Sequence, residues 1–127
     1  MKRPEELARR FLTLADRDIR AFRKLSDDPE MDDEVVGFHA QQAVEKCLKA
    51  VLAKHRVEVR KTHDLQVLIE ILIQNNLPSP PLREGIDVLG PFAVELRYDL
   101  MTTEPLEREQ ARKVVDSVRR WAEQQLS

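Results

Sequence analysis

Apolar residues recur every three or four positions over most of this chain, which is the spacing of one face of an α-helix. Residues 4–25 show it first, and their opposite face is rich in arginine, lysine and glutamate. Pro4 suits the first turn of a helix, because the N–H group that proline lacks has no partner there. We therefore predict a first helix over residues 4–25, followed by an acidic loop that contains Pro29.

The second and third predicted helices are joined by a short polar connector. The second helix covers residues 33–55. Val57 and Val59 then alternate with charged residues, but this connector is too short to build a sheet. The third helix is expected to begin at residues 62–64, with Thr62 as its N-cap and the next acid in its first turn. It ends at residues 75–76, before a proline-rich stretch.

A proline interrupts the fourth predicted helix, which covers residues 82–100. Pro91 follows Gly90, and a proline inside a helix removes one backbone hydrogen bond and clashes with the carbonyl four residues earlier, that of Asp87. We expect a kink at Gly90-Pro91 or two shorter helices. A fifth helix follows Pro105. The chain is thus predicted to be one all-α domain over residues 1–127, an up-and-down bundle of four to five antiparallel helices.

Composition agrees with a helical bundle and excludes several kinds of site. The 127 residues are 42% apolar and 35% charged, with only 3 glycines. The single cysteine, Cys47, excludes an intramolecular disulfide and a zinc site built from cysteines. The glycines are too scattered for a phosphate-binding loop, and no pair of histidines has metal-ligand spacing, so we expect neither a cofactor nor a metal.

The charge balance and the hydropathy of the chain narrow its surroundings. With 21 basic and 23 acidic residues, the net charge is -2, which argues against non-specific coating of nucleic acid. The N-terminal residues carry charges where a secretion signal has an apolar segment. No apolar run approaches the roughly 20 residues that span a bilayer. We expect a soluble, cytoplasmic protein without a membrane partner.

A stripe of polar residues runs along the second predicted helix. Gln42, Glu45 and Lys49 are spaced by three and four residues, so they share one face, and small apolar residues occupy the opposite face. Glu45 and Lys49 could form an exposed ion pair, which stabilises a surface helix by a few tenths of a kcal/mol. Apolar neighbours border the stripe, however, and such a border is typical of a face turned toward a cleft or a second subunit.

Three sequence segments together resemble the HEPN family, the higher eukaryotes and prokaryotes nucleotide-binding domain. They are FHAQQAVEKCLKAVL at residues 38–52, THDL at 62–65 and ELRYDL at 95–100. The resemblance covers nearly the whole chain and implies a helical bundle that is usually a homodimer. Members of the family divide broadly into two functional kinds. Some are metal-independent ribonucleases, often toxins. Others accompany a small nucleotidyltransferase as its nucleotide- or substrate-binding partner, or have no assigned role.

The ribonucleases of this family carry an arginine followed, after four to six residues, by a histidine. Arg97 matches the arginine, but Thr102 stands after four intervening residues, and Thr103 and Glu104 follow it. All three histidines of the chain precede Arg97. RNA cleavage without a metal needs groups that transfer protons near neutral pH, and threonine cannot do so. The resemblance therefore favours a non-catalytic member that binds a nucleotide, a separate nucleotidyltransferase, or both, as in a toxin–antitoxin pair.

Two alternatives remain open at this stage. One is a ribonuclease toxin with a degenerate site, in which Arg97 acts with Tyr98 or Asp99. The other is a structural homodimer that buries the polar stripe and binds no ligand. RNA is the less favoured ligand.

The candidate cleft combines the polar stripe with the other two motifs. Near a helix N-terminus, His63 is expected to be neutral, and Arg97 could pair with Glu45 or with a ligand phosphate. His39 and His55 are expected on the surface. The residues expected to line the cleft are Gln42, Glu45, Lys49, His63, Arg97 and Tyr98.

Overall fold

The computed structural model describes residues 3–59, 61–93 and 105–127, and the regular elements within these ranges are all helical. The helices are α1 (Pro4–Ser26), α2 (Asp33–Lys54), α3 (Leu65–Gln74), α4 (Arg83–Leu89) and α5 (Arg108–Leu126), with a 3₁₀ turn, η1, at Gly90–Phe92. The prediction of an all-α bundle is confirmed. Among the described residues, no helix combines the length and the apolarity that crossing a membrane requires.

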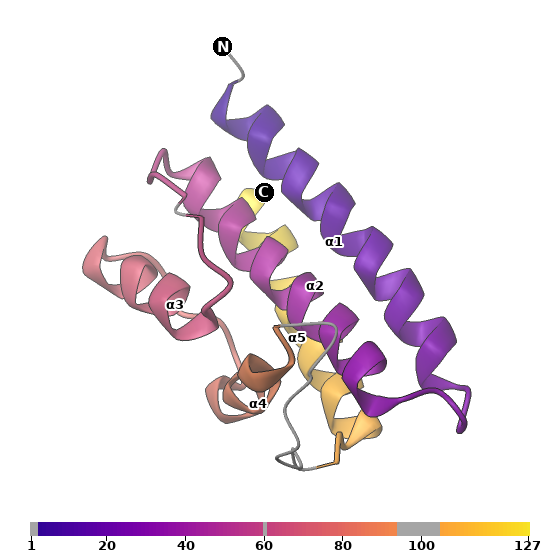
Figure 1. Cartoon of the computed structure of the whole chain (residues 1–127). Coiled ribbons are helices and arrows are strands. Elements are labelled where there is room, and N and C mark those ends of the chain that lie inside the picture. Colours follow the sequence, from indigo (N-terminus) through magenta and orange to yellow (C-terminus); the bar gives the residue numbers. More distant parts are fainter. Residues whose placement is uncertain (1–2, 60, 94–104) are drawn as a thin grey trace.

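Helix α2 lies at the centre of the bundle (Figure 1). The long helix α1 packs antiparallel against it, α5 lies behind α2, and α3 and α4 cover the remaining side. Buried residues consequently occur on almost every side of α2, from Val36 to Ala53. A helix enclosed in this way has little solvent-accessible surface, so its polar stripe cannot be a solvent-exposed face.

Polar contacts at both ends fix α5 alongside α2. At one end, the backbone N–H of Leu106 donates to Oδ2 of Asp33 over 3.1 Å. At the other end, Nζ of Lys54 donates to the carbonyl of Leu126, also over 3.1 Å. The N-terminal ends of α2 and α5 are therefore neighbours, as are their C-terminal ends, and the two helices run in the same direction.

Arg108 joins the turn between α1 and α2 to the beginning of α5. Its guanidinium donates to Oδ1 of Asp33 and to the carbonyls of Ser26, Asp28 and Met31. A planar guanidinium has five N–H donors in a fixed arrangement, so one side chain can hold several acceptors of a turn in place. The acidic loop predicted between the first two helices is thus anchored by a residue far along the chain.

The predicted interruption at Gly90-Pro91 is confirmed. Helix α4 ends at Leu89, and Gly90–Phe92 form η1, with proline in its first turn. Phe92 is buried against α2 at Gly37, where an added Cβ would lie 2.3 Å from the phenylalanine ring. Glycine is thus the residue that lets this ring approach the helix backbone. The remainder of the fourth predicted helix, residues 94–100, lies outside the described residues.

The predicted N-cap of the third helix was wrong. The cap is Asp64, whose Oδ1 accepts the N–H groups of Gln66 (2.9 Å) and Val67 (3.4 Å). Thr62 instead accepts the N–H of Asp64 over 3.1 Å. A carboxylate satisfies two free N–H groups and also complements the positive end of the helix dipole, so the N-cap lies two residues later than predicted and the helix begins at Leu65.

Candidate functional site

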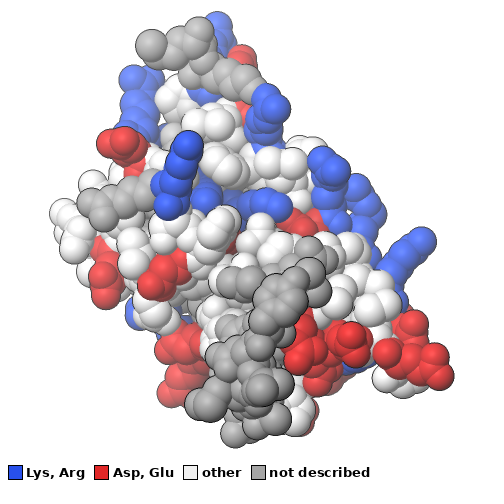
Figure 2. Space-filling view, viewed as in Figure 1, with Lys and Arg blue, Asp and Glu red and all other residues white. Residues whose placement is uncertain are grey.

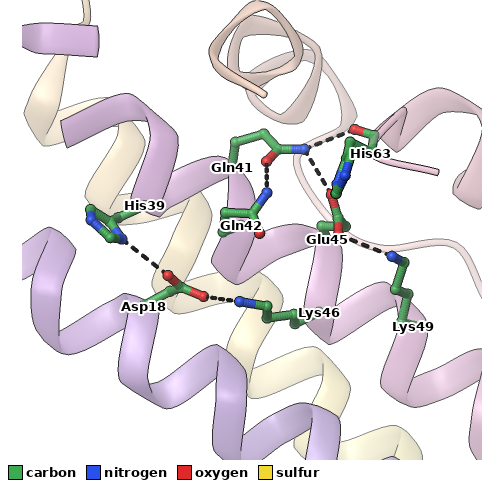
Figure 3. A network of polar contacts seen from close by, with 8 residues as sticks. All are labelled: Asp18, His39, Gln41, Gln42, Glu45, Lys46, Lys49 and His63. Carbon is green, nitrogen blue, oxygen red and sulfur yellow. Dashed lines mark hydrogen bonds and ion pairs between the residues drawn. The ribbon is translucent and has the colours of Figure 1, made fainter. Parts of the chain in front are cut away.

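The polar stripe of α2 is largely buried, and its side chains meet those of neighbouring residues in one cluster (Figure 3). Glu45 is 2% exposed and Gln42 is 9% exposed, and the adjacent Gln41 is fully buried. Burying a carboxylate costs several kcal/mol unless hydrogen bonds and opposite charges compensate for the water it loses. In the part of the chain that the structure describes, every buried side-chain nitrogen and oxygen has a hydrogen-bond partner. The cluster is therefore fully satisfied by the protein itself.

Glu45 is the centre of this cluster. Its Oε2 accepts a hydrogen bond from Nζ of Lys49 over 3.0 Å, one helical turn away. Its Oε1 lies 2.9 Å from Nδ1 of His63 and 3.3 Å from Nε2 of Gln41. Both carboxylate oxygens are thus engaged, by one cation, one imidazole and one amide. The interpretation of Glu45 and Lys49 as a surface ion pair was wrong, because α3, α4 and the connector that leads to α3 cover this side of α2.

The imidazole ring of His63 is bonded to Glu45 on one side and exposed to solvent on the other. It stands just before α3, and its carbonyl accepts a hydrogen bond from Nε2 of Gln41 over 2.9 Å. A carboxylate only accepts hydrogen bonds, so pairing with an ionised Glu45 requires the proton of the imidazole to be on Nδ1. The side chain of His63 is 69% exposed. Its second nitrogen is therefore available to a ligand while Glu45 fixes the orientation of the ring.

Gln41 is the member of the cluster that the sequence interpretation missed. It connects Glu45 to the backbone of His63, and its Oε1 accepts a hydrogen bond from Nε2 of Gln42 over 2.8 Å. One signal was present in the sequence, because Gln41 lies four residues before Glu45 and so shares its side of the helix. The sequence analysis assigned Gln42 to the stripe instead, and the structure shows that the amide of Gln42 reaches Glu45 only through its hydrogen bond to Gln41.

A second polar group lies between α1 and α2 (Figure 3). Asp18 of α1 accepts from Nζ of Lys46 and lies 3.0 Å from Nδ1 of His39, with its side chain only 12% exposed. The expectation that His39 is a surface residue was wrong, because its side chain is 23% exposed and paired. His55 is exposed, as expected. This group ties two core helices together and does not contact the Glu45 cluster.

Two cavities adjoin the cluster. The larger, about 850 Å³, is lined by Lys49 together with residues of α1 and of the connector after α2. The smaller, about 470 Å³, is lined by His63, by the start of α3, by α4 and by Gly90 and Ala93, which follow α4. Lys49 and His63, which are both bound to Glu45, therefore each face a different cavity. The cluster thus contributes one side chain to the lining of each cavity.

The described residues give no support for a metal centre or a reactive thiol. Among residues 3–59, 61–93 and 105–127, no three His, Cys, Asp or Glu side chains are grouped closely enough to hold a metal ion. Cys47 is buried in the core, and burial raises the pKa of its thiol to about 12. A thiol in that state is neither a nucleophile nor a metal ligand at neutral pH. The chemistry of the site is therefore that of amides, one carboxylate, one ammonium and one imidazole.

The structure brings together four of the six residues predicted to line the cleft. Gln42, Glu45, Lys49 and His63 are linked, directly or through Gln41. Arg97 and Tyr98, and with them Asp99 and Thr102 of the ribonuclease signature, lie outside the described residues. Their part in the site stays a prediction from the sequence.

Comparison with known proteins gives one match. The model of the HEPN domain family matches residues 8–125, which is nearly the whole chain. No curated protein and no solved structure matches.

Proposed function

The chain belongs to the HEPN domain family, and from this premise we propose that it is a non-catalytic member whose Glu45 cluster binds the phosphates of a nucleotide. The observation that carries the proposal is a buried carboxylate that holds an ammonium and an imidazole in place beside two cavities. Such groups need little further ordering when a ligand arrives, so less affinity is lost to side-chain entropy.

Lys49 is suited to contact an anion without leaving Glu45. Its Nζ has three N–H donors, and among the described residues one of them is given to Glu45. The carboxylate offsets part of the positive charge, so a tightly bound phosphate needs a second cation. We assign that role to Arg97, because an arginine can bind a phosphate through two parallel hydrogen bonds.

Titration of purified protein with ATP tests this assignment. By isothermal calorimetry, Lys49→Met and Arg97→Ala should each weaken ATP binding by about tenfold or more, since charge-assisted hydrogen bonds contribute about 1.5–3 kcal/mol. Lys113→Met is the matched control, because Lys113 is exposed on α5 and lines neither cavity. The absence of saturable ATP binding by the wild-type protein would refute the nucleotide proposal.

One observation favours a ribonuclease as the second candidate function. Glu45 orients His63 through Nδ1 and leaves the other nitrogen toward solvent, which is how a carboxylate prepares a histidine to act as a general base. Against this candidate, the sequence has no histidine after Arg97 that could serve as a second proton-transfer group. Incubation with single-stranded RNA in the presence of EDTA separates the two functions. Cleavage that is abolished in both His63→Ala and Arg97→Ala would replace our proposal by the ribonuclease.

We further propose that the protein is a homodimer and that its partner is a separate small nucleotidyltransferase, in an arrangement like a toxin–antitoxin pair. The family membership supports this, and the chain contains no Gly-Ser motif followed by paired acids from which it could supply that activity itself. A search for a nucleotidyltransferase gene beside this one, co-expression of the two, and light scattering of the purified material test both parts. A monomer that does not retain the nucleotidyltransferase during purification would contradict them.

A further inference from the structure

We propose that the 850 Å³ cavity binds a single-chain amphipathic anion, meaning a ligand with an apolar body and one carboxylate or phosphate head. This space lies between the N-terminal half of α1, the last turns of α2 and the connector that follows α2. Its volume falls within the range of about 300–1,000 Å³ that small-molecule sites occupy. The proposal does not depend on nucleotide binding by the Glu45 cluster.

Apolar side chains provide one half of this cavity. Leu7 and Phe11 of α1 lie one turn apart on the same face, and Val57 and Val59 of the connector approach them from the other side. All four are only partly buried, although they pack against the core. The alternation of valine with charge in the connector thus has a structural reason, because both valines turn inward while Glu58 between them stays exposed.

Positive charge provides the other half. Four cationic side chains line the cavity, those of Arg3, Lys49, Arg56 and Lys61, against one carboxylate, that of Glu58. Among the described residues, the side chains of Arg3, Arg56 and Lys61 form no ion pair. Figure 2 shows lysine and arginine gathered toward the end of the molecule where α1 begins, with acidic side chains toward the opposite end. A ligand head that entered here would have to be negatively charged.

Arg56 has a backbone conformation that an arginine rarely adopts. Its φ of 61° is left-handed, and it ends α2 in a Schellman motif, with N–H bonds from Arg56 to Ala53 and from Val57 to Leu52. Glycine or asparagine occupies this position at a lower conformational cost. The end of α2 therefore requires a left-handed residue here, and arginine meets that requirement at a higher conformational cost than glycine would. The residue that bears this strain places a guanidinium on the cavity wall.

Helix α3 ends in the same motif and gives an internal comparison. Asn76 has a φ of 57°, and the N–H groups of Asn76 and Leu77 donate to Ile73 and Leu72. The α3 end thus uses a residue that tolerates the left-handed conformation, and it lines neither of the two larger cavities. The α2 end, which does line a cavity, uses arginine.

The lining also indicates what the ligand lacks. Among the described residues, no Ser, Thr, Asn, Gln, Tyr or His side chain lines the cavity. A nucleobase or a sugar is recognised through several neutral hydrogen-bonding groups, and this cavity offers such a ligand only apolar surface and charge. An alkyl or aryl chain with a single anionic head matches both halves of the lining.

NMR-monitored titration with octanoate, octanol and acetate tests the proposal. Octanol has the alkyl chain without the carboxylate, and acetate has the carboxylate without the long alkyl chain. Octanoate should bind saturably with one site per chain, and octanol and acetate should each bind at least about tenfold more weakly. Equal binding of octanoate and octanol, or no saturable binding of octanoate, would overturn the proposal. Tighter binding of AMP than of octanoate, with shifts at the same cavity residues, would overturn the choice of ligand.

Arg56→Gly separates binding from folding. It should weaken octanoate binding by about tenfold, whereas the thermal unfolding midpoint should not fall, because glycine relieves the left-handed strain. Asn76→Gly is the matched control: it makes the equivalent change at the end of α3 and should leave octanoate binding unchanged. Unaltered octanoate binding by Arg56→Gly would refute the role given to the guanidinium.

Discussion

Replacing Glu45 by glutamine should destabilise the protein far more than the loss of a surface ion pair would. The substitution keeps the size of the side chain but removes a charge that is 2% exposed, opposite a lysine whose side chain is 12% exposed. Breaking a buried pair by removing one partner costs about 3–5 kcal/mol. Lys49 borders a cavity and His63 is largely exposed, so both can recover some water, and we expect the lower end, about 3 kcal/mol.

Urea unfolding followed by circular dichroism measures this loss directly. For a domain of this size, about 3 kcal/mol corresponds to a fall of about 12 °C in the thermal midpoint. A double-mutant cycle with Lys49→Met then isolates the pairwise term, and we expect a coupling free energy of about 2 kcal/mol, within the range found for residues in contact.

Glu123→Gln is the matched control for this experiment. Glu123 also holds two cations, Arg9 and Arg119, but its side chain is 42% exposed, so its loss should cost less than about 1 kcal/mol. The hydrogen bond from Arg9 lowers the pKa of Glu123. The stabilisation by Glu123 is therefore complete above the pKa of the unfolded state and is lost as the pH falls through the lowered pKa of the folded state.

A loss below about 1 kcal/mol in Glu45→Gln, equal to that of the control, would refute the reasoning. It would mean that Glu45 exchanges freely with water and that the cluster is not a preorganised site. A large loss without coupling to Lys49 would place the stabilisation in the bonds to Gln41 and His63 instead.

Three further predictions follow from the packing. Arg108→Ala should lower the free energy of unfolding by about 3 kcal/mol in urea titration, because it removes the bonds that hold the α1–α2 turn. Gly37→Ala should cost about 2 kcal/mol in the same assay, since the new methyl group would overlap the ring of Phe92. With its pKa raised to about 12 by burial, Cys47 should react with iodoacetamide at pH 8 only after urea unfolds the protein, as mass spectrometry can show.

The sequence was a reliable guide to the helices and a partial guide to the site. The predicted bounds of the first two helices differ from α1 and α2 by one residue at their C-terminal ends, and the interruption at Gly90-Pro91 was placed correctly. The start of α3 was misplaced because a threonine and an aspartate compete to cap it, and the prediction chose the threonine although aspartate is the stronger N-cap residue. Gln41 was missed because its role depends on a carbonyl 22 residues away.

By itself, then, the sequence determined the helical elements, their breaks and the grouping of Gln42, Glu45 and Lys49 on one face of α2. These follow from the helical period and from proline and glycine chemistry, which act over a few residues. Only the tertiary structure decided that this face is buried, that His63 reaches Glu45, and that Arg56 faces a cavity. Burial depends on which distant segments pack around a helix, and a pattern of polar residues looks the same whether water or another helix covers it.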